Sequence, residues 1–271
     1  MGQVLRETDA GVLLLTLNRP ERNNAWTIEM EHEYFEALAQ AAADAEVRAI
    51  VVTGTGKSFC PGLDMQILAE SGATGKPLTD QPRRPMTFAR SVPKPVIAAI
   101  NGACAGIGMV QACSADLRFV ARGAKLATSF ARRGLPAENA LAWILPRLVG
   151  TGAAMDLLLS GRTLQAEEAA GIGLAERLCE PETVVADAIE YAKDLAAHCS
   201  PRAMAAIKRQ VWQDWEGTAE QSRQTSLALM EALRSEMKEG SASFVEKRPP
   251  AFPGLSVTLV EERTTRSDYP A

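Results

Sequence analysis

Histidine is scarce in this 271-residue chain, and its cysteines do not form pairs, which excludes several kinds of site. His32 and His198 are the two histidines, and both fall in helical-looking stretches. The five cysteines are odd in number and lack the short paired spacings of a zinc site, so free thiols in a reducing cytosol fit best. Cys60 lies in a glycine loop, but a thiol nucleophile needs a neighbouring base such as histidine. We expect Cys60 to be a small packing residue, and we expect no metal site.

Long apolar runs and an excess of positive charge are also missing. No apolar segment reaches membrane-spanning length, and the first seven residues are too polar for a secretory signal, which predicts a cytoplasmic protein without a membrane partner. The formal net charge is −4, so bulk charge gives no reason to expect nucleic-acid binding. An anionic ligand would therefore need a local group of cations.

The pattern of apolar residues predicts alternating strands and helices, which indicates an α/β fold. A helix is expected from Ile28 to Asp44, capped by Thr27, with others from about Gly108 and over Ala140–Leu148. From Pro181 the sequence changes to alanine-rich helical stretches. Strands are expected at Val12–Leu17, Arg48–Thr53, Val96–Ile100 and Leu117–Val120, and C-terminal helices at Val184–Ala197, Pro201–Trp212 and Ala219–Lys238.

Two glycine-punctuated loops carry most of the functional information. The first, Ser58–Asp64, and the second, Asn101–Gly108, each follow an apolar, strand-like run and precede a helix start. This arrangement presents free backbone N–H groups to a negative charge. Two such loops that converge on one oxygen would form an oxyanion hole. For either loop alone, an ordinary turn with glycine at positive φ is the simpler interpretation.

Nucleotide-binding motifs do not fit these loops. Gly54–Ser58 ends like a phosphate-binding loop, but that motif needs a glycine where Val51 stands. Gly106 and Gly108 begin a dinucleotide fingerprint, but its third glycine position is occupied by Gln111. The oxyanion-hole interpretation is therefore favoured.

The loop sequences resemble those of the crotonase superfamily, the enoyl-CoA hydratases and isomerases. Residues 54–65 are similar to the family segment G-x-G-K/R-x-F-x-x-G-x-D, and residues 93–102 are similar to its K-P-V-I-A-A-I-x-G segment. The resemblance extends from Leu14 to Phe252 and implies a crotonase-like ββα spiral core with a C-terminal α-helical oligomerisation region. On this basis we expect a core with the acyl-CoA site over residues 1–200, and the helical region and tail over residues 201–271. Further similar segments are Leu17–Ala25, Leu159–Leu174 and Phe244–Pro249.

The resemblance also implies which residues form the site. The N–H of Leu63, after Gly62, and the N–H of Ile107, after Gly106, match the family's oxyanion donors. Loss of one such donor typically costs about 2.7–4 kcal/mol of transition-state stabilisation. The two carboxylates that hold water in the family hydratases fall on Val110 and Phe130 here. Neither side chain can orient water or carry a proton, so hydratase chemistry is not expected.

Glu138 matches the position of a catalytic acid in several family isomerases. A different interpretation is that it lies in the first turn of a helix running through Trp143, where a carboxylate stabilises the helix dipole by about 0.3–1 kcal/mol. Because Val110 and Phe130 are apolar, Glu138 is the sole matched acid, and we interpret it as the base of an enoyl-CoA isomerase. It would move a proton between two carbons of a thioester whose carbonyl is held in the hole, and an apolar wall would raise its pKa. An enoyl-CoA hydratase and a catalytically silent acyl-CoA binder remain alternatives.

CoA is part of the expected substrate, so no separate cofactor is expected. The resemblance places Arg22 and Ala25 near the CoA and Lys247 near its phosphates, with a solvated surface charge as the other interpretation of each cation. Asp64 is expected to fix its loop by bonding to backbone N–H groups. The segment Ser71–Pro85 is rich in Gly, Pro and Thr and is expected to be a mobile linker, or a gate beside the acyl pocket as the resemblance implies.

The C-terminal helices offer apolar surface with little sheet left for it to cover. One interpretation is packing within the same chain. The resemblance implies that the surface also forms a homotrimer, which can pair into a homohexamer. The residues concerned are Trp212, Trp215, Leu227 and Met230.

Overall fold

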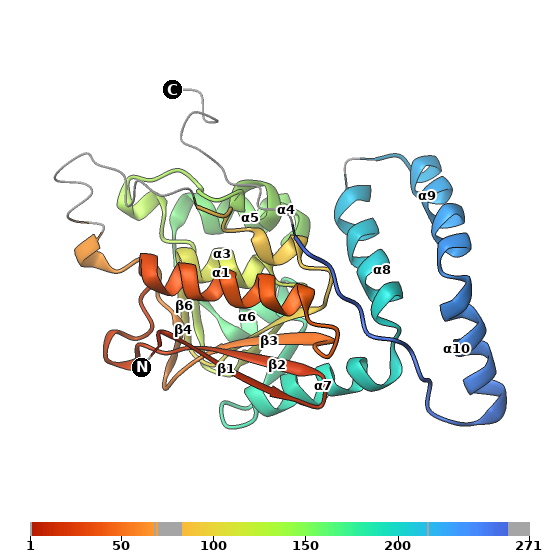
Figure 1. The fold of residues 1–271 in the computed structure, drawn as a ribbon. Helices are drawn as coiled ribbons and strands as arrows, with labels where there is room; N and C mark the ends of the chain where they lie inside the picture. Colours follow the sequence, from red (N-terminus) through yellow and green to blue (C-terminus); the bar gives the residue numbers. More distant parts are fainter. Residues whose placement is uncertain (1, 68, 70–82, 216, 260–271) are drawn as a thin grey trace.

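The computed structural model describes residues 2–67, 69, 83–215 and 217–259, and it contains two β-sheets with helices around them (Figure 1). The larger sheet has the order β1-β2-β3-β5-β7-β10 and is parallel apart from the β1–β2 pair. The smaller sheet has the order β4-β6-β8-β9. The strands are β1 (Val4–Asp9), β2 (Val12–Leu17), β3 (Ala49–Gly54), β4 (Ser58–Cys60), β5 (Val96–Ile100), β6 (Ala103–Ala105), β7 (Leu117–Ala121), β8 (Lys125–Ala127), β9 (Leu164–Gln165) and β10 (Arg177–Cys179).

Strands of the large sheet lead directly into strands of the small sheet. β3 continues into β4, β5 into β6, and β7 into β8, which confirms the predicted α/β fold with a ββα spiral core. The residues of β3 and β5 are all buried, as expected for parallel strands that are covered on both faces. Their unbroken apolar runs are the reason that the sequence predicts them.

Helices cover the sheets and separate them. α1 (Ile28–Ala43) packs on β1 and β2, and Thr27 caps it by accepting the Met30 N–H at 3.1 Å. Figure 1 shows α1 above the large sheet and α7 (Val184–His198) below it. α3 (Ile107–Ser114) contacts β4, β5 and β6, and all of its residues are buried. The remaining elements of this part are η1 (Pro20–Arg22), η2 (Phe88–Ser91), η3 (Ala131–Arg133), α4 (Leu141–Val149), α5 (Thr151–Ser160) and α6 (Ala166–Gly171).

The C-terminal part consists of α8 (Pro201–Asp214), α9 (Ala219–Ala232) and α10 (Arg234–Glu246). The single helix expected over residues 219–238 is therefore wrong. Leu233 leaves helical geometry, with φ −104° and ψ 17°, and separates α9 from α10. In Figure 1, α9 and α10 stand beyond α8, on the side away from the sheets.

The chain after α10 returns to the core. The Val257 N–H donates to the Ala42 carbonyl at 2.9 Å, and Arg48 donates to the Phe252 carbonyl at 2.8 Å. The poor order expected for the end of the tail concerns residues outside those described. Most of the expected mobile segment from Ser71 to Pro85 also lies outside them.

The two tryptophans of the C-terminal part do not form an exposed patch. Trp212 and Trp215 are half-buried and contact each other, with ring centroids 4.5 Å apart. Trp215 also contacts Trp143 of α4 at 5.1 Å, and the Arg90 guanidinium lies 3.9 Å from the Trp212 ring. Packing within the chain is therefore confirmed for this pair, while a part in an interface between copies stays a prediction.

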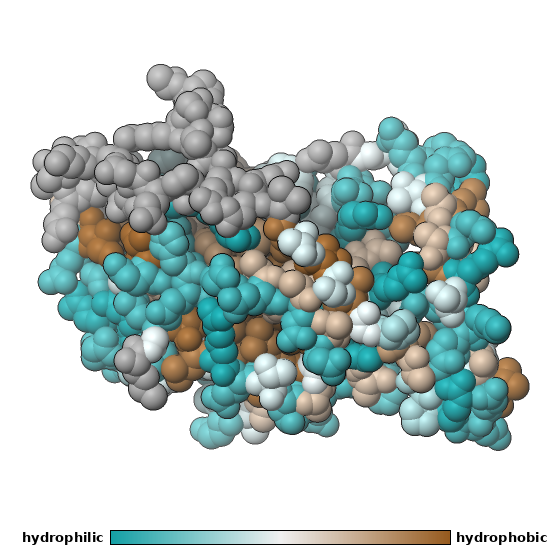
Figure 2. All heavy atoms as spheres, viewed as in Figure 1, coloured by the Kyte–Doolittle hydropathy of each residue, from teal (hydrophilic) through white to brown (hydrophobic). Residues whose placement is uncertain are grey.

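Leu227 and Met230 keep the exposure that the sequence predicts, with 51% and 54% of their surface open to solvent. On the face drawn in Figure 2, hydrophilic residues dominate and hydrophobic ones form separate spots, some at the outer side of the C-terminal helices. Within the described part of the chain, no helix is long and apolar enough to cross a membrane.

Candidate active site

The small sheet brings the ends of the two glycine loops together. β4, β6 and β8 pair in parallel, with Cys60 opposite Cys104 and Ala105 opposite Ala127. The carboxyl ends of parallel strands meet at one edge of a sheet, so the residues after β4 and after β6 lie side by side. Those residues are Gly62 and Leu63 in the first loop, and Gly106 and Ile107 in the second.

The loops touch at their glycines. Gly62 has φ +116°, and a Cβ there would lie 3.2 Å from the Ala105 carbonyl oxygen and 3.7 Å from the Gly106 Cα. Gly106 has φ +52°, and a Cβ on it would lie 3.6 Å from the Gly62 Cα. Both positions therefore favour glycine, because a side chain would be strained at each and would crowd the other loop at Gly62.

The peptide at Leu63 is fixed from both sides by Trp26. The Trp26 N–H donates to the Gly62 carbonyl at 2.8 Å, and the Asp64 N–H donates to the Trp26 carbonyl at 2.9 Å. Ile107 is the first residue of α3, where N–H groups have no acceptor within the helix. Among the described residues, no hydrogen-bond acceptor takes the N–H of Leu63 or Ile107, so both donors are available to a ligand.

A close approach at Gly108 fixes the start of α3. A Cβ on Gly108 would collide with the Cys60 carbonyl group and side chain. Helix α3 therefore lies directly on β4, and the distance between the two candidate donors depends on this contact. Cys60 itself is fully buried, and burial raises the pKa of its thiol to about 12, which agrees with the predicted packing role.

Asp64 stabilises the first loop more extensively than the sequence predicts. It accepts the Gln66 N–H at 3.0 Å, as expected of a loop-fixing carboxylate. It also forms ion pairs at 3.2 Å with Arg22 and with Arg19. These bonds, that of Arg22 first, lower the pKa of Asp64. Arg19 was not predicted, and it also donates to the Ala25 carbonyl at 2.6 Å.

The three residues expected near CoA lie in different places. Arg22 is partly exposed beside Asp64, and half-buried Ala25 is in the adjoining turn. Lys247 is exposed at the end of α10, which Figure 1 places far from β4 and β6. Within one chain, the structure therefore brings Arg22 and Ala25 to the first loop but does not bring Lys247 there.

The two positions that carry carboxylates in the family hydratases are apolar and buried. Val110 lies one turn after Ile107 in α3, and its surface is fully buried. Phe130 directly precedes η3 and is 5% exposed. Both belong to the main hydrophobic core. Neither side chain has a donor or an acceptor with which to hold a water molecule.

Glu138 does not lie in the first turn of a helix, so that interpretation is wrong. α4 begins at Leu141, because Asn139 and Ala140 adopt left-handed geometry with φ of 55° and 61° and separate Glu138 from the helix. Glu138 is exposed to solvent, yet the protein packed around its carboxyl group raises the pKa above its usual value. The positive charge of Arg83 partly offsets that increase.

Glu31 and Arg83 form a partly buried pair that was not predicted from the sequence. Glu31 of α1 accepts two hydrogen bonds from Arg83, from Nε and from a terminal nitrogen, both at 2.6 Å. Its carboxylate also accepts the Trp26 indole N–H at 3.1 Å. No local signal predicts this pair, because its members are 52 residues apart in the chain.

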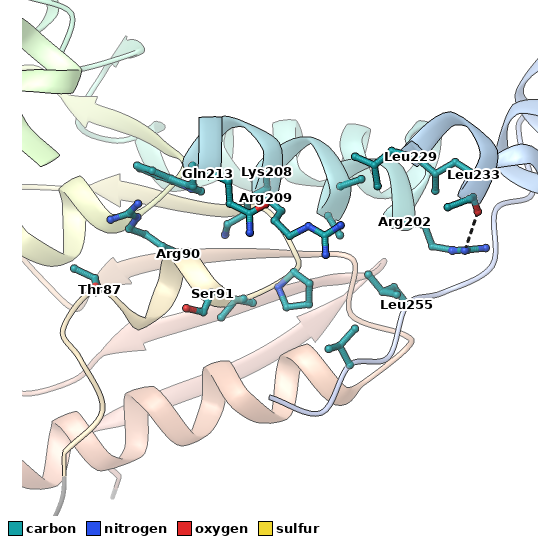
Figure 3. Close-up of a pocket in the computed structure, with 17 residues that line it drawn as sticks. Thr87, Arg90, Ser91, Arg202, Lys208, Arg209, Gln213, Leu229, Leu233 and Leu255 are labelled. Atoms are coloured by element: carbon teal, nitrogen blue, oxygen red, sulfur yellow. Dashed lines mark hydrogen bonds between the residues drawn. The ribbon is translucent and has the colours of Figure 1, made fainter. Parts of the chain in front are cut away.

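A cavity of about 620 Å³ lies elsewhere, between η2, α8, α9 and the returning tail. Figure 3 shows Arg90, Lys208 and Arg209 around it, with Leu229, Leu233 and Leu255 on its other side. The ammonium group of Lys208 already has partners within the protein, because it pairs with Asp116 at 2.7 Å and donates to the Ala89 carbonyl at 2.9 Å. Among the described residues that line the cavity, none is a predicted site residue, so we do not assign the chemistry to it.

Known proteins match nearly the whole chain. A family model described as enoyl-CoA hydratase/isomerase matches residues 7–254. The chain is 32% identical to the 1,2-epoxyphenylacetyl-CoA isomerase of Escherichia coli K12, over 93% of this chain and 98% of that protein. It is 47% identical to an enoyl-CoA hydratase of known structure from Mycobacterium marinum, with a TM-score of 0.68, over 78% of this chain and 98% of that one. An enoyl-CoA hydratase structure from Polaromonas sp. JS666 has 29% identity and a TM-score of 0.86, over 93% of this chain and 100% of that one.

Proposed function

The chain belongs to the enoyl-CoA hydratase/isomerase family, and from that premise we propose that it is an enoyl-CoA isomerase that moves a double bond by a 1,3 proton shift. The observation that carries the proposal is the distribution of carboxylates. Val110 and Phe130 cannot hold water, whereas Glu138 is the one matched acid that remains, and its pKa is raised. The names of the relatives do not decide the matter, because one is an isomerase and others are hydratases.

The mechanism begins with the thioester carbonyl between the two glycine loops. The N–H groups of Leu63 and Ile107 donate to its oxygen and stabilise the negative charge that develops when a proton leaves the α carbon. Ile107 adds the positive end of the α3 dipole. The same interactions acidify the α carbon before proton transfer.

Glu138 performs both proton transfers. As a carboxylate it removes a proton from C2 of a 3-enoyl-CoA, which gives a dienolate held by the two N–H groups. The resulting carboxylic acid then returns a proton to C4, and the double bond moves to C2–C3. One group can serve both steps because it is regenerated as the carboxylate. The buried side chains of Val110 and Phe130 hold no water for a competing addition.

We expect hydration of crotonyl-CoA to be slow or absent. The reason is that addition of water needs a carboxylate to activate it, and Val110 and Phe130 replace the pair that does so in the family hydratases. Initial rates with 3-enoyl-CoA and with 2-enoyl-CoA, measured at the same enzyme concentration, check this. Saturable hydration at a rate comparable to isomerisation would support the hydratase alternative. Tight binding without turnover of either substrate would support the silent-binder alternative.

We propose that the protein assembles into a trimer or hexamer through its C-terminal helices. Ile207 and Val211 of α8 are exposed one turn apart, as are Leu227 and Met230 of α9, and each is more than half exposed. Apolar surface of this kind usually marks an interface, and closed rings are the common form of homo-oligomers. Lys247, which one chain does not bring to its own loops, could then lie beside the CoA of a neighbouring copy.

Aspartate at Leu227 or Met230 is expected to release monomers that bind CoA poorly. The new charge would have to be buried against the neighbouring copy, which is costly without a partner. Light scattering at low micromolar concentration gives the mass, and Leu159→Asp, at an exposed leucine of α5, is the matched change outside these helices. A wild-type monomer would contradict the assembly and leave these residues as ordinary surface.

A further inference from the structure

The cavity between η2, α8, α9 and the returning tail lies apart from the candidate active site. Ser91 and Pro93, which line it, come just before β5, whereas the second glycine loop comes just after that strand. The residues of β5 span about 13 Å at about 3.3 Å per residue, so the two places are at opposite ends of the strand. The cavity volume of about 620 Å³ falls within the range of about 300–1,000 Å³ that is usual for small-molecule sites.

One wall of the cavity carries positive charge. Arg202 and Arg209 lie two turns apart on α8, about 10 Å along the helix axis, so they share one face of the helix. Ala205 and Ala206 lie between them, and their small side chains leave space in front of the helix. Among the described residues that line the cavity, none is acidic, so no lining residue offsets this charge.

Arg209 differs from the other cations of this wall. Lys208 has its partners within the protein, and Arg202 lies 3.7 Å from the Glu236 carboxylate. The Arg90 guanidinium stacks on a tryptophan ring of α8, 3.9 Å from its centroid. Arg209 is exposed and forms no hydrogen bond or ion pair with the part of the chain that the structure describes. One uncommitted guanidinium suits a ligand with a single negative charge, such as a carboxylate, better than a polyphosphate.

The opposite wall of the cavity is apolar and incompletely covered. Leu229 and Leu233 of α9, together with Leu255 and Val257 of the tail, line it and are only half-buried. No residue of α9 is fully buried, so this helix has no packed core of its own to cover its leucines. In Figure 3, Arg209 extends from α8 into the cavity, and the three leucines lie to one side of it. An alkyl chain against them would remove their exposed surface from water.

We propose that this cavity is a binding site for a fatty carboxylate. The carboxylate accepts two parallel hydrogen bonds from the Arg209 guanidinium, which is the geometry that this pair of groups favours. The alkyl chain covers the leucines of α9 and of the tail and thereby connects both segments to η2. This is a second site, which does not depend on the isomerase reaction.

Affinity is expected to depend on both parts of the ligand. In the series hexanoate, octanoate and decanoate, each added CH2 group should lower Kd by about two- to fourfold. 1-Octanol has the chain of octanoate without its charge and should bind at least about tenfold more weakly, because a hydrogen bond between charged groups is lost. Isothermal titration calorimetry at pH 7, below the concentrations at which micelles form, gives each Kd.

Arg209→Gln tests the position of the carboxylate. Because Arg209 is exposed and unpaired within the described part of the chain, the variant should fold like the wild type. We expect its Kd for octanoate to rise at least about tenfold and its Kd for 1-octanol to stay nearly unchanged. Arg223→Gln, the same change at an exposed arginine of α9 outside the cavity, is the matched control and should leave both values unchanged. Ala205→Phe fills the cavity and should weaken the binding of both ligands.

Competition separates this site from the candidate active site. Saturating butyryl-CoA should leave the Kd of octanoate unchanged, because the two places lie at opposite ends of β5. Displacement of octanoate by butyryl-CoA, wild-type affinity in Arg209→Gln, or no saturable binding of any of the three carboxylates would overturn the proposal. Absence of isomerisation would refute only the proposed function, since these measurements do not use the reaction.

Discussion

Replacing Glu138 with glutamine is expected to lower kcat for double-bond migration by about 10²–10⁴-fold, the usual contribution of a general acid–base group. Glutamine has nearly the same shape but cannot take the proton from C2. The Kd of a saturated acyl-CoA, which binds but cannot react, should change by less than about threefold, because the Leu63 and Ile107 N–H groups and the CoA contacts are untouched. Stopped-flow or steady-state absorbance of the conjugated product gives kcat, and calorimetry gives Kd.

Glu190→Gln is the matched control for this variant. Glu190 is exposed on α7, and the same chemical change there should leave kcat and Kd unchanged. Full isomerase activity in Glu138→Gln would remove this residue from the mechanism. Because Glu138 lies outside α4, stabilisation of the helix dipole from the first turn would not explain the glutamate at this position either.

Alanine at Gly108 is expected to lower kcat/KM by about 10²–10³-fold, the effect of losing one oxyanion donor. Its Cβ would collide with the Cys60 carbonyl, so α3 must move away from β4. That movement displaces the Ile107 N–H from the Leu63 N–H, and it also strains a fully buried helix. We therefore expect a lower melting temperature together with the loss of activity.

Gly152→Ala separates this local effect from the general effect of adding a methyl group. Gly152 lies in α5 with no atom within 4 Å of the added Cβ, so activity should be unchanged, and stability should rise by up to about 1 kcal/mol. Thermal unfolding followed by circular dichroism measures both variants. A fully active Gly108→Ala protein would show that catalysis does not depend on the placement of α3.

The sequence predicts the parts of the fold in which apolar pattern and burial coincide. β3 and β5 are buried along their whole length, and α1 has a Thr27 cap that the structure reproduces. β1 was not predicted, because it is an edge strand whose residues are mostly exposed and polar. The break at Leu233 was not predicted either, since no glycine or proline marks it.

The candidate site likewise has features that the sequence predicts and features that it does not. The glycine loops are recognisable because each needs glycine where another backbone approaches closely, and the structure brings Gly62 and Gly106 together. The turn at Glu138 was misassigned, because Ala140 in left-handed geometry leaves no signal in the sequence. The Glu31–Arg83 pair joins distant segments through side chains alone, so only the folded chain reveals it.

The most direct test of the central claim is the fate of hydrogen in one turnover. A 3-enoyl-CoA is incubated with the wild-type protein in D2O, and the product is analysed by NMR. We predict a 2-enoyl-CoA in which hydrogen has been lost from C2 and delivered to C4, with no oxygen added at C3. A 3-hydroxyacyl-CoA as the main product, or recovered substrate with its double bond unmoved, would contradict the account.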